Sequence, residues 1–240
     1  MAMKQWLKRK GRDPSSENES ALAENPEPRS QCVLVLDNSS SMGGDKIAQV
    51  NQGLIDFLQI LRTDEMASER VELAIVTFGG SVKIAQEFVL AKDFTPPQLT
   101  AGGDTPLCEA VCEAGRLIRE RRQLYKEFEI DSFRPFVVVI TDGYPNSDDS
   151  IEAAQQMVRD FESATNPADQ ASFFFFGVEG ADMKTLNAIS KRPAMKIRGA
   201  QFRQVFPWAG LSVRQISTSN VGDNVELPQI TKFLKLDLDS

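Results

Sequence analysis

A cluster of oxygen-bearing side chains follows an apolar run near the start of the sequence. The run Cys32-Val33-Leu34-Val35-Leu36 ends in Asp37-Asn38-Ser39-Ser40-Ser41. A wholly apolar run of this length is typical of a buried strand, which would deliver the polar residues to the edge of a sheet. Because side chains of an extended segment repeat every two residues, we expect Asp37, Ser39 and Ser41 to point the same way. Asn38 and Ser40 then face elsewhere.

Two later loops carry the same kind of side chain. They are Gly102-Gly103-Asp104-Thr105 and Thr141-Asp142-Gly143, and the second directly follows the apolar run Phe136-Val137-Val138-Val139-Ile140. In an open α/β sheet the loops at the carboxyl ends of the strands form the crevice where ligands bind. We therefore expect Thr105 and Asp142 to join the residues of the first loop.

Carboxylate and hydroxyl oxygens are the ligands that hard divalent cations prefer. A Mg²⁺ ion takes six oxygens at about 2.0–2.1 Å and usually keeps some of its water. The sequence predicts a site for Mg²⁺ or Mn²⁺, with one coordination position left for water or for an oxygen of a partner. Its predicted ligands are Asp37, Ser39, Ser41, Thr105 and Asp142.

Each loop alone has a plainer explanation. Asp37 and the serines could cap a helix that begins near Asp45, and Asp142-Gly143 could be a simple turn. Three such loops at three successive positions favour the metal site.

The remaining chain alternates between strand and helix patterns. Apolar residues at helical spacing predict a helix after the first loop, with Ile47, Val50, Leu54, Phe57, Leu58 and Leu61 on one face. The runs Val71 to Phe78 and Val82 to Val89 are separated by Gly79-Gly80, which predicts a hairpin and an antiparallel edge strand. Further helices are expected after Pro106, at 151–161, around 183–189 and from Gln201, with strands at 136–140, 173–178 and 195–197. We predict an α/β fold: a doubly wound, mostly parallel sheet with one antiparallel edge strand and helices on both faces.

The predicted domain occupies residues 31–217, between an N-terminal tail of residues 1–30 and a C-terminal tail of residues 218–240. The N-terminal tail is rich in Pro, Ser and Glu and offers little apolar surface for a core. Its first ten residues combine Trp6 and Leu7 with lysines. They could touch an anionic membrane or an acidic partner, or form a solvated basic leader.

Composition excludes several classes of function. The net charge of −7 argues against non-specific nucleic-acid binding, and the absence of histidine excludes a Cys/His zinc site and a His-based triad. Three cysteines do not form a disulfide framework. No run approaches 18 apolar residues, so we expect no membrane span, and the N-terminus lacks the apolar centre of a secretory signal. These features predict a soluble cytoplasmic protein.

Four arginines crowd one side of the helix expected after Pro106: Arg116, Arg119, Arg121 and Arg122. We interpret them as a solvated helix face, with a docking patch for an acidic partner as the alternative.

The sequence resembles a von Willebrand factor type A (vWA) domain. Asp37-x-Ser39-x-Ser41, Thr105 and Asp142 match the metal-ion-dependent adhesion site (MIDAS) motif of that family residue by residue. Three further segments look like the bacterial cytoplasmic branch associated with tellurite resistance: Val50-Asn51-Gln52-Gly53-Leu54, Phe94-Thr95-Pro96-Pro97 and Val205-Phe206-Pro207-Trp208. The resemblance covers residues 31–217 and implies metal-bridged binding of a protein carboxylate, from an Asp or Glu, without catalysis.

Two positions depart from the family pattern. Ser40 stands where the family often has glycine, and Asp104 precedes Thr105 where glycine is common. An extra carboxylate beside the ion could tighten cation binding or repel an acidic ligand.

A Mg²⁺-dependent phosphatase of the haloacid dehalogenase class is the alternative function, because it also places an Asp after the first strand. That chemistry needs a second carboxylate two residues later to protonate the leaving oxygen, and Ser39 stands there instead. Nucleotide binding is disfavoured because no glycine-rich phosphate loop follows a strand. We therefore predict a binding module and not an enzyme.

Overall fold

The computed structural model describes residue 22 and residues 25–146, 150–197 and 201–233. Its centre is a six-stranded sheet in the order β3-β2-β1-β4-β5-β6. The strands are β1 (Ser30–Asp37), β2 (Val71–Gly79), β3 (Ser81–Leu90), β4 (Phe136–Thr141), β5 (Ser172–Gly177) and β6 (Met195–Lys196). All neighbouring pairs are parallel except β2 with β3. The predicted mostly parallel α/β sheet with an antiparallel edge strand is confirmed.

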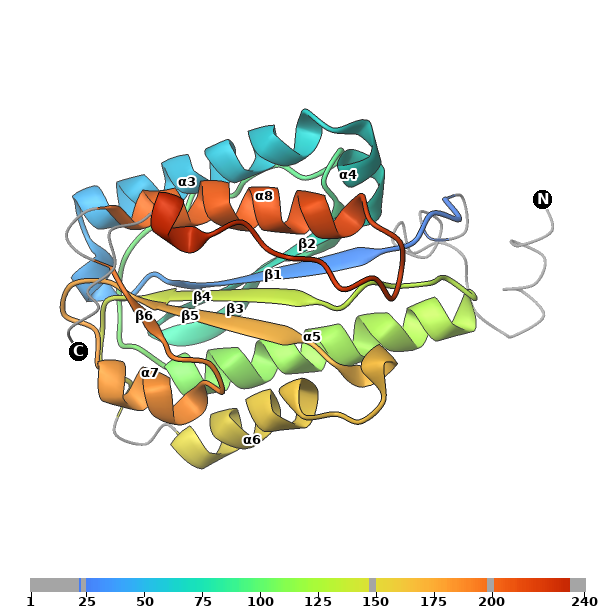
Figure 1. Ribbon diagram of the computed structural model, residues 1–240. Coiled ribbons are helices and arrows are strands. Elements are labelled where there is room, and N and C mark those ends of the chain that lie inside the picture. Colours follow the sequence, from blue (N-terminus) through green and yellow to red (C-terminus); the bar gives the residue numbers. More distant parts are fainter. Residues whose placement is uncertain (1–21, 23–24, 147–149, 198–200, 234–240) are drawn as a thin grey trace, which may run out of the picture.

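Two helical layers enclose the sheet (Figure 1). One layer contains α3 (Asp45–Arg62), α4 (Glu65–Arg70) and α8 (Val205–Ser217), and the other contains α5 (Leu107–Glu127), α6 (Ile151–Glu162) and α7 (Met183–Ile189). Short 3₁₀ turns lie at Ser40–Met42, Pro167–Asp169, Gln201–Gln204 and Ile230–Lys232. Among the described helices, none combines the length and apolar composition needed to cross a membrane.

Strand β1 is buried on both faces because it lies in the middle of the sheet. Leu34 and Leu36 belong to the core beneath α3 and α8, whereas Val33 and Val35 belong to the core beneath α5 and α6. This two-sided burial explains why the sequence of β1 is a continuous apolar run. It also fixes the strand end, and with it the position of Asp37.

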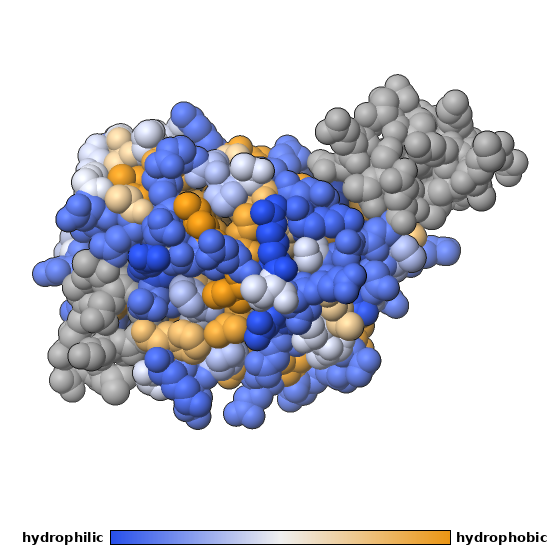
Figure 2. Space-filling model, turned by 90° about the horizontal axis from the view of Figure 1, so that it is seen from above, coloured by the Kyte–Doolittle hydropathy of each residue, from blue (hydrophilic) through white to orange (hydrophobic). Residues whose placement is uncertain are grey.

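The layer of α3 and α8 shows a mainly hydrophilic outer surface with patches of hydrophobic residues (Figure 2). Ile55 of α3 and Met66 of α4 are exposed. Scattered apolar residues of this kind are ordinary on protein surfaces. The buried apolar side chains of α3, among them Val50, Leu54 and Phe57, belong to the core beneath α3 and α8, as the helical spacing predicts.

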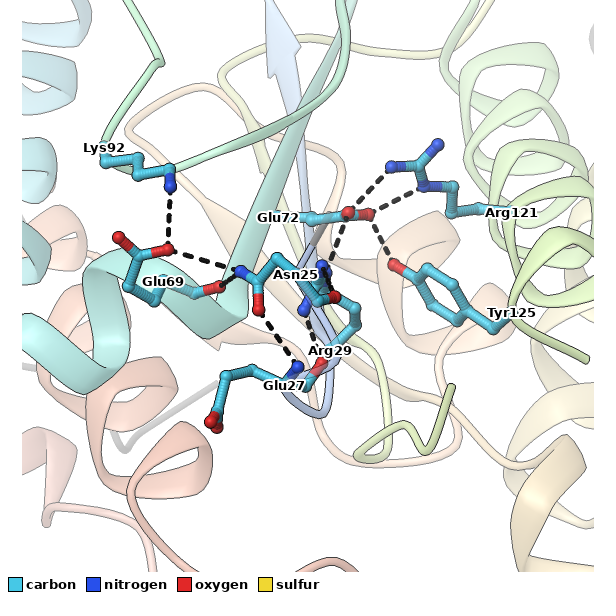
Figure 3. A network of polar contacts seen from close by, with 8 residues as sticks. All are labelled: Asn25, Glu27, Arg29, Glu69, Glu72, Lys92, Arg121 and Tyr125. Atoms are coloured by element: carbon cyan, nitrogen blue, oxygen red, sulfur yellow. Dashed lines mark hydrogen bonds and ion pairs between the residues drawn. The ribbon is translucent and has the colours of Figure 1, made fainter. Parts of the chain in front are cut away.

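A buried ionic network lies at the start of β2 (Figure 3). Glu72 accepts two hydrogen bonds of 2.7 Å from Arg121 and one of 2.5 Å from Tyr125. Arg29 lies 3.3 Å from the same carboxylate and also donates to the carbonyl oxygens of Asn25 and Glu27. The network therefore ties the segment before β1 to α5 and β2.

The structure corrects the sequence interpretation of the arginines on α5. Arg116 and Arg119 are exposed and paired with acidic residues, as a solvated helix face requires. Arg121 and Arg122 are buried. Burial of Arg122 lowers the pKa of its guanidinium to about 10. These two arginines belong to the interior and not to a docking patch.

Residues after α8 return along the sheet. The indole of Trp208 donates a 2.9 Å hydrogen bond to the carbonyl oxygen of Pro228. Leu227, Ile230 and Phe233 pack against the core beneath α3 and α8. This C-terminal segment therefore covers part of the same core.

Candidate metal site

The candidate site lies at the carboxyl ends of β1 and β4. These strands are hydrogen-bonded neighbours, and their pairing runs from Cys32 with Phe136 to Leu36 with Ile140. Asp37 and Asp142 follow the last paired positions, at the same edge of the sheet. The prediction that the two carboxylates share one edge is confirmed.

Asp37 is fully buried, and both of its carboxylate oxygens accept hydrogen bonds. The backbone N–H of Ser39 donates to Oδ1 at 2.8 Å, and the hydroxyl of Thr141 donates to Oδ2 at 2.5 Å. Burial raises the pKa of Asp37, and the nearby Asp142 carboxylate adds to the rise, whereas the bonds from Ser39 and Thr141 oppose it. A positive charge placed beside Asp37 would stabilise its ionised form.

Hydrogen bonds connect the first loop to Asp142. The hydroxyls of Ser39 and Ser41 lie 3.0 Å apart, and Ser41 donates to Oδ1 of Asp142 at 2.6 Å. The ammonium of Lys46 forms an ion pair with Oδ2 of the same carboxylate. Side chains from residues about a hundred positions apart in the sequence thus meet at one point.

Thr105 reaches the cluster from the loop just before α5. A Cβ placed on Gly143 would lie 3.2 Å from Oγ1 of Thr105 and 3.7 Å from Oδ2 of Asp37. Both oxygens therefore approach the same side of Gly143. The side chain of Asn146 accepts a 2.9 Å hydrogen bond from the backbone N–H of Thr105 and holds that loop in place.

Asn38 and Ser40 point away from this cluster. The side-chain amide of Asn38 donates to the carbonyl oxygen of Thr100, and the hydroxyl of Ser40 donates to the carbonyl oxygen of Gly103. Both side chains therefore hold the first loop against the second. The expected grouping of the side chains is confirmed, but Ser40–Met42 form a 3₁₀ turn and not the extended segment from which it was predicted.

Gly79 and Gly80, where β2 turns into β3, lie against both the first loop and the second. Gly103 has a φ of +80°, and a Cβ there would lie 2.4 Å from both the Cα and the N of Gly80. A Cβ on Gly79 would lie 2.4 Å from the carbonyl oxygen of Asn38. Only glycine allows backbones to come this close. The β2–β3 turn therefore helps to set the position of Thr105 relative to the first loop.

The donor set fits a hard cation. Within the described ranges, no group of three or more His, Cys, Asp or Glu side chains could hold a metal ion. The candidate site combines two carboxylates with three hydroxyls instead, which suits a divalent cation that prefers oxygen. The hydroxyl of Ser39 bonds Ser41, and Ser39 occupies the position where a phosphatase of the haloacid dehalogenase class needs an acid. Ser39 therefore offers a hydroxyl where that chemistry needs a carboxylic acid.

Sequence reasoning missed three residues that shape the site: Lys46, Thr141 and Asn146. Thr141 had a signal, because it precedes Asp142 at the end of an apolar strand. Lys46 and Asn146 carry no motif of their own, and their roles depend on the relative placement of separate loops.

The sequence model of the von Willebrand factor type A domain matches residues 32–206. The chain belongs to this family. The match runs from within β1 to the start of α8 and so includes all five predicted site residues of the vWA domain.

Three solved structures resemble the vWA domain in fold. Proximal thread matrix protein 1 from the mussel byssus, in a structure described as having a zinc-occupied MIDAS motif, has a TM-score of 0.53 and 15% identity over 79% of this chain and 48% of that one. The pilus adhesin SpaC from Lactobacillus rhamnosus GG has a TM-score of 0.59 and 12% identity over 80% of this chain and 31% of that one. The vWF domain of the pilus tip protein Mfa5 from Porphyromonas gingivalis has a TM-score of 0.54 and 11% identity over 82% of this chain and 99% of that one.

At these identities the similarity shows the fold alone. The chain spans about half the length of the mussel protein and about a third of SpaC. A search of curated protein sequences found no match.

Proposed function

We propose that the site binds a divalent cation, Mg²⁺ or Mn²⁺, through Asp37, Ser39, Ser41, Thr105 and Asp142. The observation that carries this proposal is the unbroken set of contacts from Asp37 through Ser39 and Ser41 to Asp142. Two carboxylates balance the charge of a divalent ion, and the hydroxyl oxygens can turn their lone pairs toward it.

We propose further that the loaded site binds a carboxylate from an Asp or Glu of a protein partner. Five protein ligands leave a coordination position open in an octahedral shell, and a cation neutralised by two carboxylates still favours an added anionic oxygen. The zinc-occupied MIDAS motif named for the mussel protein supports the metal-binding part of this proposal. The proposed role is binding without catalysis, consistent with the lack of histidine and with Ser39 at the acid position.

The proposed binding module is the domain at residues 31–217, flanked by residues 1–30 and 218–240. Its proposed setting is the bacterial cytoplasm, in a stress or tellurite-resistance system, on the strength of the segments quoted above. Two of those segments contact each other, because a Cβ on Gly53 would lie 2.2 Å from the ring of Phe206. Asn51 exchanges two hydrogen bonds with the backbone of Leu99. These contacts give the segments a structural role in the domain.

The metal proposal is tested by calorimetric titration of Mn²⁺ and Mg²⁺ and by thermal unfolding at increasing ion concentration. A ligand at 100 times its Kd adds about 2.7 kcal/mol to the free energy of unfolding, which should raise Tm by several degrees in a chain of this size. Asp37→Ala and Asp142→Ala should abolish the rise. Asp45→Ala is the matched control, because this exposed carboxylate begins α3 beside the site and is not a proposed ligand. No heat of binding and no change in Tm with either ion would refute the proposal.

The carboxylate proposal is tested on the Mn²⁺-loaded protein with ¹³C-labelled acetate as the probe. Electron–nuclear double resonance should detect the labelled carbon within the distance of a directly bound carboxylate. Ser41→Ala should weaken the signal together with metal binding. A loaded ion that keeps only water at saturating acetate would refute the proposed mode of partner binding.

A further inference from the structure

An ion pair between Lys46 of α3 and Asp142 lies at one side of the candidate site. Lys46 lies in the first turn of α3, and its ammonium contacts Oδ2 of Asp142. The side chain of Asp142 is 0% exposed, whereas that of Lys46 is 35% exposed. The acid is therefore fixed inside the site, and the lysine reaches it from the surface.

Lys46 brings positive charge to Asp142, one of the two buried carboxylates of the site. Both oxygens of Asp37 and Oδ1 of Asp142 accept bonds from uncharged donors, namely a backbone N–H and two hydroxyls. The fourth oxygen, Oδ2 of Asp142, faces the ammonium of Lys46. Burying carboxylates without a compensating cation is costly, so this ion pair stabilises the arrangement of the site.

We infer that Lys46 is the resident counter-cation of the site and that it leaves Asp142 when a divalent ion binds. This inference rests on the proposed metal site and adds a regulatory element to it. A cation coordinated by Asp142 and the ammonium of Lys46 repel each other at this separation, because both carry positive charge. Metal binding and the ion pair therefore oppose each other.

The position of Lys46 allows this exchange. Its ammonium is a compact charge on a flexible four-carbon stem, and a third of the side chain already contacts solvent. The core face of α3 is formed by other residues, among them Val50, Leu54 and Phe57. Release of Lys46 leaves that packing intact. The lysine thus lowers the apparent affinity for the ion by the strength of one ion pair.

The decisive experiment compares Mn²⁺ titrations of wild type and Lys46→Met by calorimetry. The variant keeps the apolar stem and removes the charge. We expect it to bind Mn²⁺ about fivefold more tightly, which corresponds to about 1 kcal/mol for a partly exposed ion pair. Its metal-free Tm should fall, because Asp142 loses its cation. Lys46→Arg should stay close to wild type, because it retains the charge.

Lys92→Met is the matched control. Lys92 forms an exposed ion pair of 2.8 Å with Glu69, so the substitution removes the same charge from a surface pair outside the candidate site. Its affinity for Mn²⁺ should equal that of wild type. Equal affinities of wild type and Lys46→Met would overturn the inference while leaving the metal site intact. A failure of both proteins to bind would refute the metal site itself, and the inference with it.

Site-resolved acetylation gives a second readout that does not depend on the affinity of a variant. The wild-type protein is treated with a limiting amount of an N-hydroxysuccinimide acetate ester, and modified lysines are quantified by mass spectrometry. Labelling of Lys46 should rise on addition of Mn²⁺, and labelling of Lys92 should stay constant. Unchanged or reduced labelling of Lys46 in the loaded protein would show that it stays on Asp142 and would refute the exchange.

Discussion

The hydroxyl of Thr141 donates a 2.5 Å hydrogen bond to Oδ2 of Asp37, from the last residue of β4 to the last residue of β1. Thr141 also accepts a bond of 3.2 Å from the backbone N–H of Gly143. This single hydroxyl therefore orients the carboxylate of one strand and the loop that follows the other. Residues that orient metal ligands in this way commonly affect affinity about tenfold or more.

Thr141→Val should weaken Mn²⁺ binding about tenfold and lower the free energy of unfolding of the metal-free protein by about 1–2 kcal/mol. The substitution keeps the shape and removes the donor to a buried acid. Thr77→Val is the control, since Thr77 is also buried, in β2, and its hydroxyl makes only a 3.5 Å contact with the carbonyl oxygen of Lys83. Calorimetry and urea unfolding measure the two effects. Equal losses in both variants would mean that the bond to Asp37 has no special role.

Asp37→Asn should stabilise the metal-free protein and abolish its binding of Mn²⁺. Asparagine fits the same space without a charge, and burial already disfavours the ionised form of Asp37. We expect the metal-free variant to gain about 1 kcal/mol, a rise in Tm of about 2–4 °C, and to lose its response to Mn²⁺. Thermal unfolding with and without the ion tests both points. A variant that still gains stability from Mn²⁺ would argue against Asp37 as a ligand.

The contact between Gly103 and Gly80 should be intolerant of even one methyl group. Gly103→Ala adds a Cβ at a φ of +80° and against backbone atoms, so a loss of about 2–3 kcal/mol in the free energy of unfolding is expected. Mn²⁺ binding should weaken as well, because Gly103 accepts the hydrogen bonds of Ser40. Gly102→Ala is the comparison, because a Cβ at this neighbouring glycine meets nothing within 4 Å. Similar urea midpoints for the two variants would contradict the close approach.

The carboxylate of Glu72 should be essential to stability although it lies outside the candidate site. Glu72→Gln leaves the buried Arg29 and Arg121 without a counter-charge, and breaking one partner of such a pair costs about 3–5 kcal/mol. Glu69→Gln, which affects an exposed pair with Lys92, should cost less than about 1 kcal/mol. Chemical unfolding compares the two. A small loss at Glu72 would mean that water or backbone groups already satisfy the arginines.

The sequence predicted the central strands and the loop that follows each of them because these features are local. An apolar run ending in an acid can be recognised without knowing its neighbours, as for β1 with Asp37 and β4 with Asp142. The burial of Arg121 could not be recognised in this way. Its place follows from the packing of α5 on the sheet, which brings it to Glu72, a residue 49 positions away.

Lys46 illustrates the same limit within the site. In the sequence it is an ordinary first-turn lysine, and its pairing with Asp142 depends on how the end of β4 lies beside the start of α3. The helix periodicity that identified Val50 and Leu54 as core residues contains no information about this contact.

The adjacency of β1 and β4 bears on the size of the cation that the proposed site can accept. Parallel strands are held about 4.8 Å apart by their hydrogen bonds, and the pairing of β1 with β4 ends at Leu36 and Ile140, one residue before Asp37 and two residues before Asp142. A Ca²⁺ ion takes six to eight oxygens at about 2.3–2.6 Å and would need a wider opening than an ion of the size of Mg²⁺. At the proposed metal site, anchoring both acid-bearing loops on adjacent strands should therefore favour an ion of the size of Mg²⁺ over Ca²⁺.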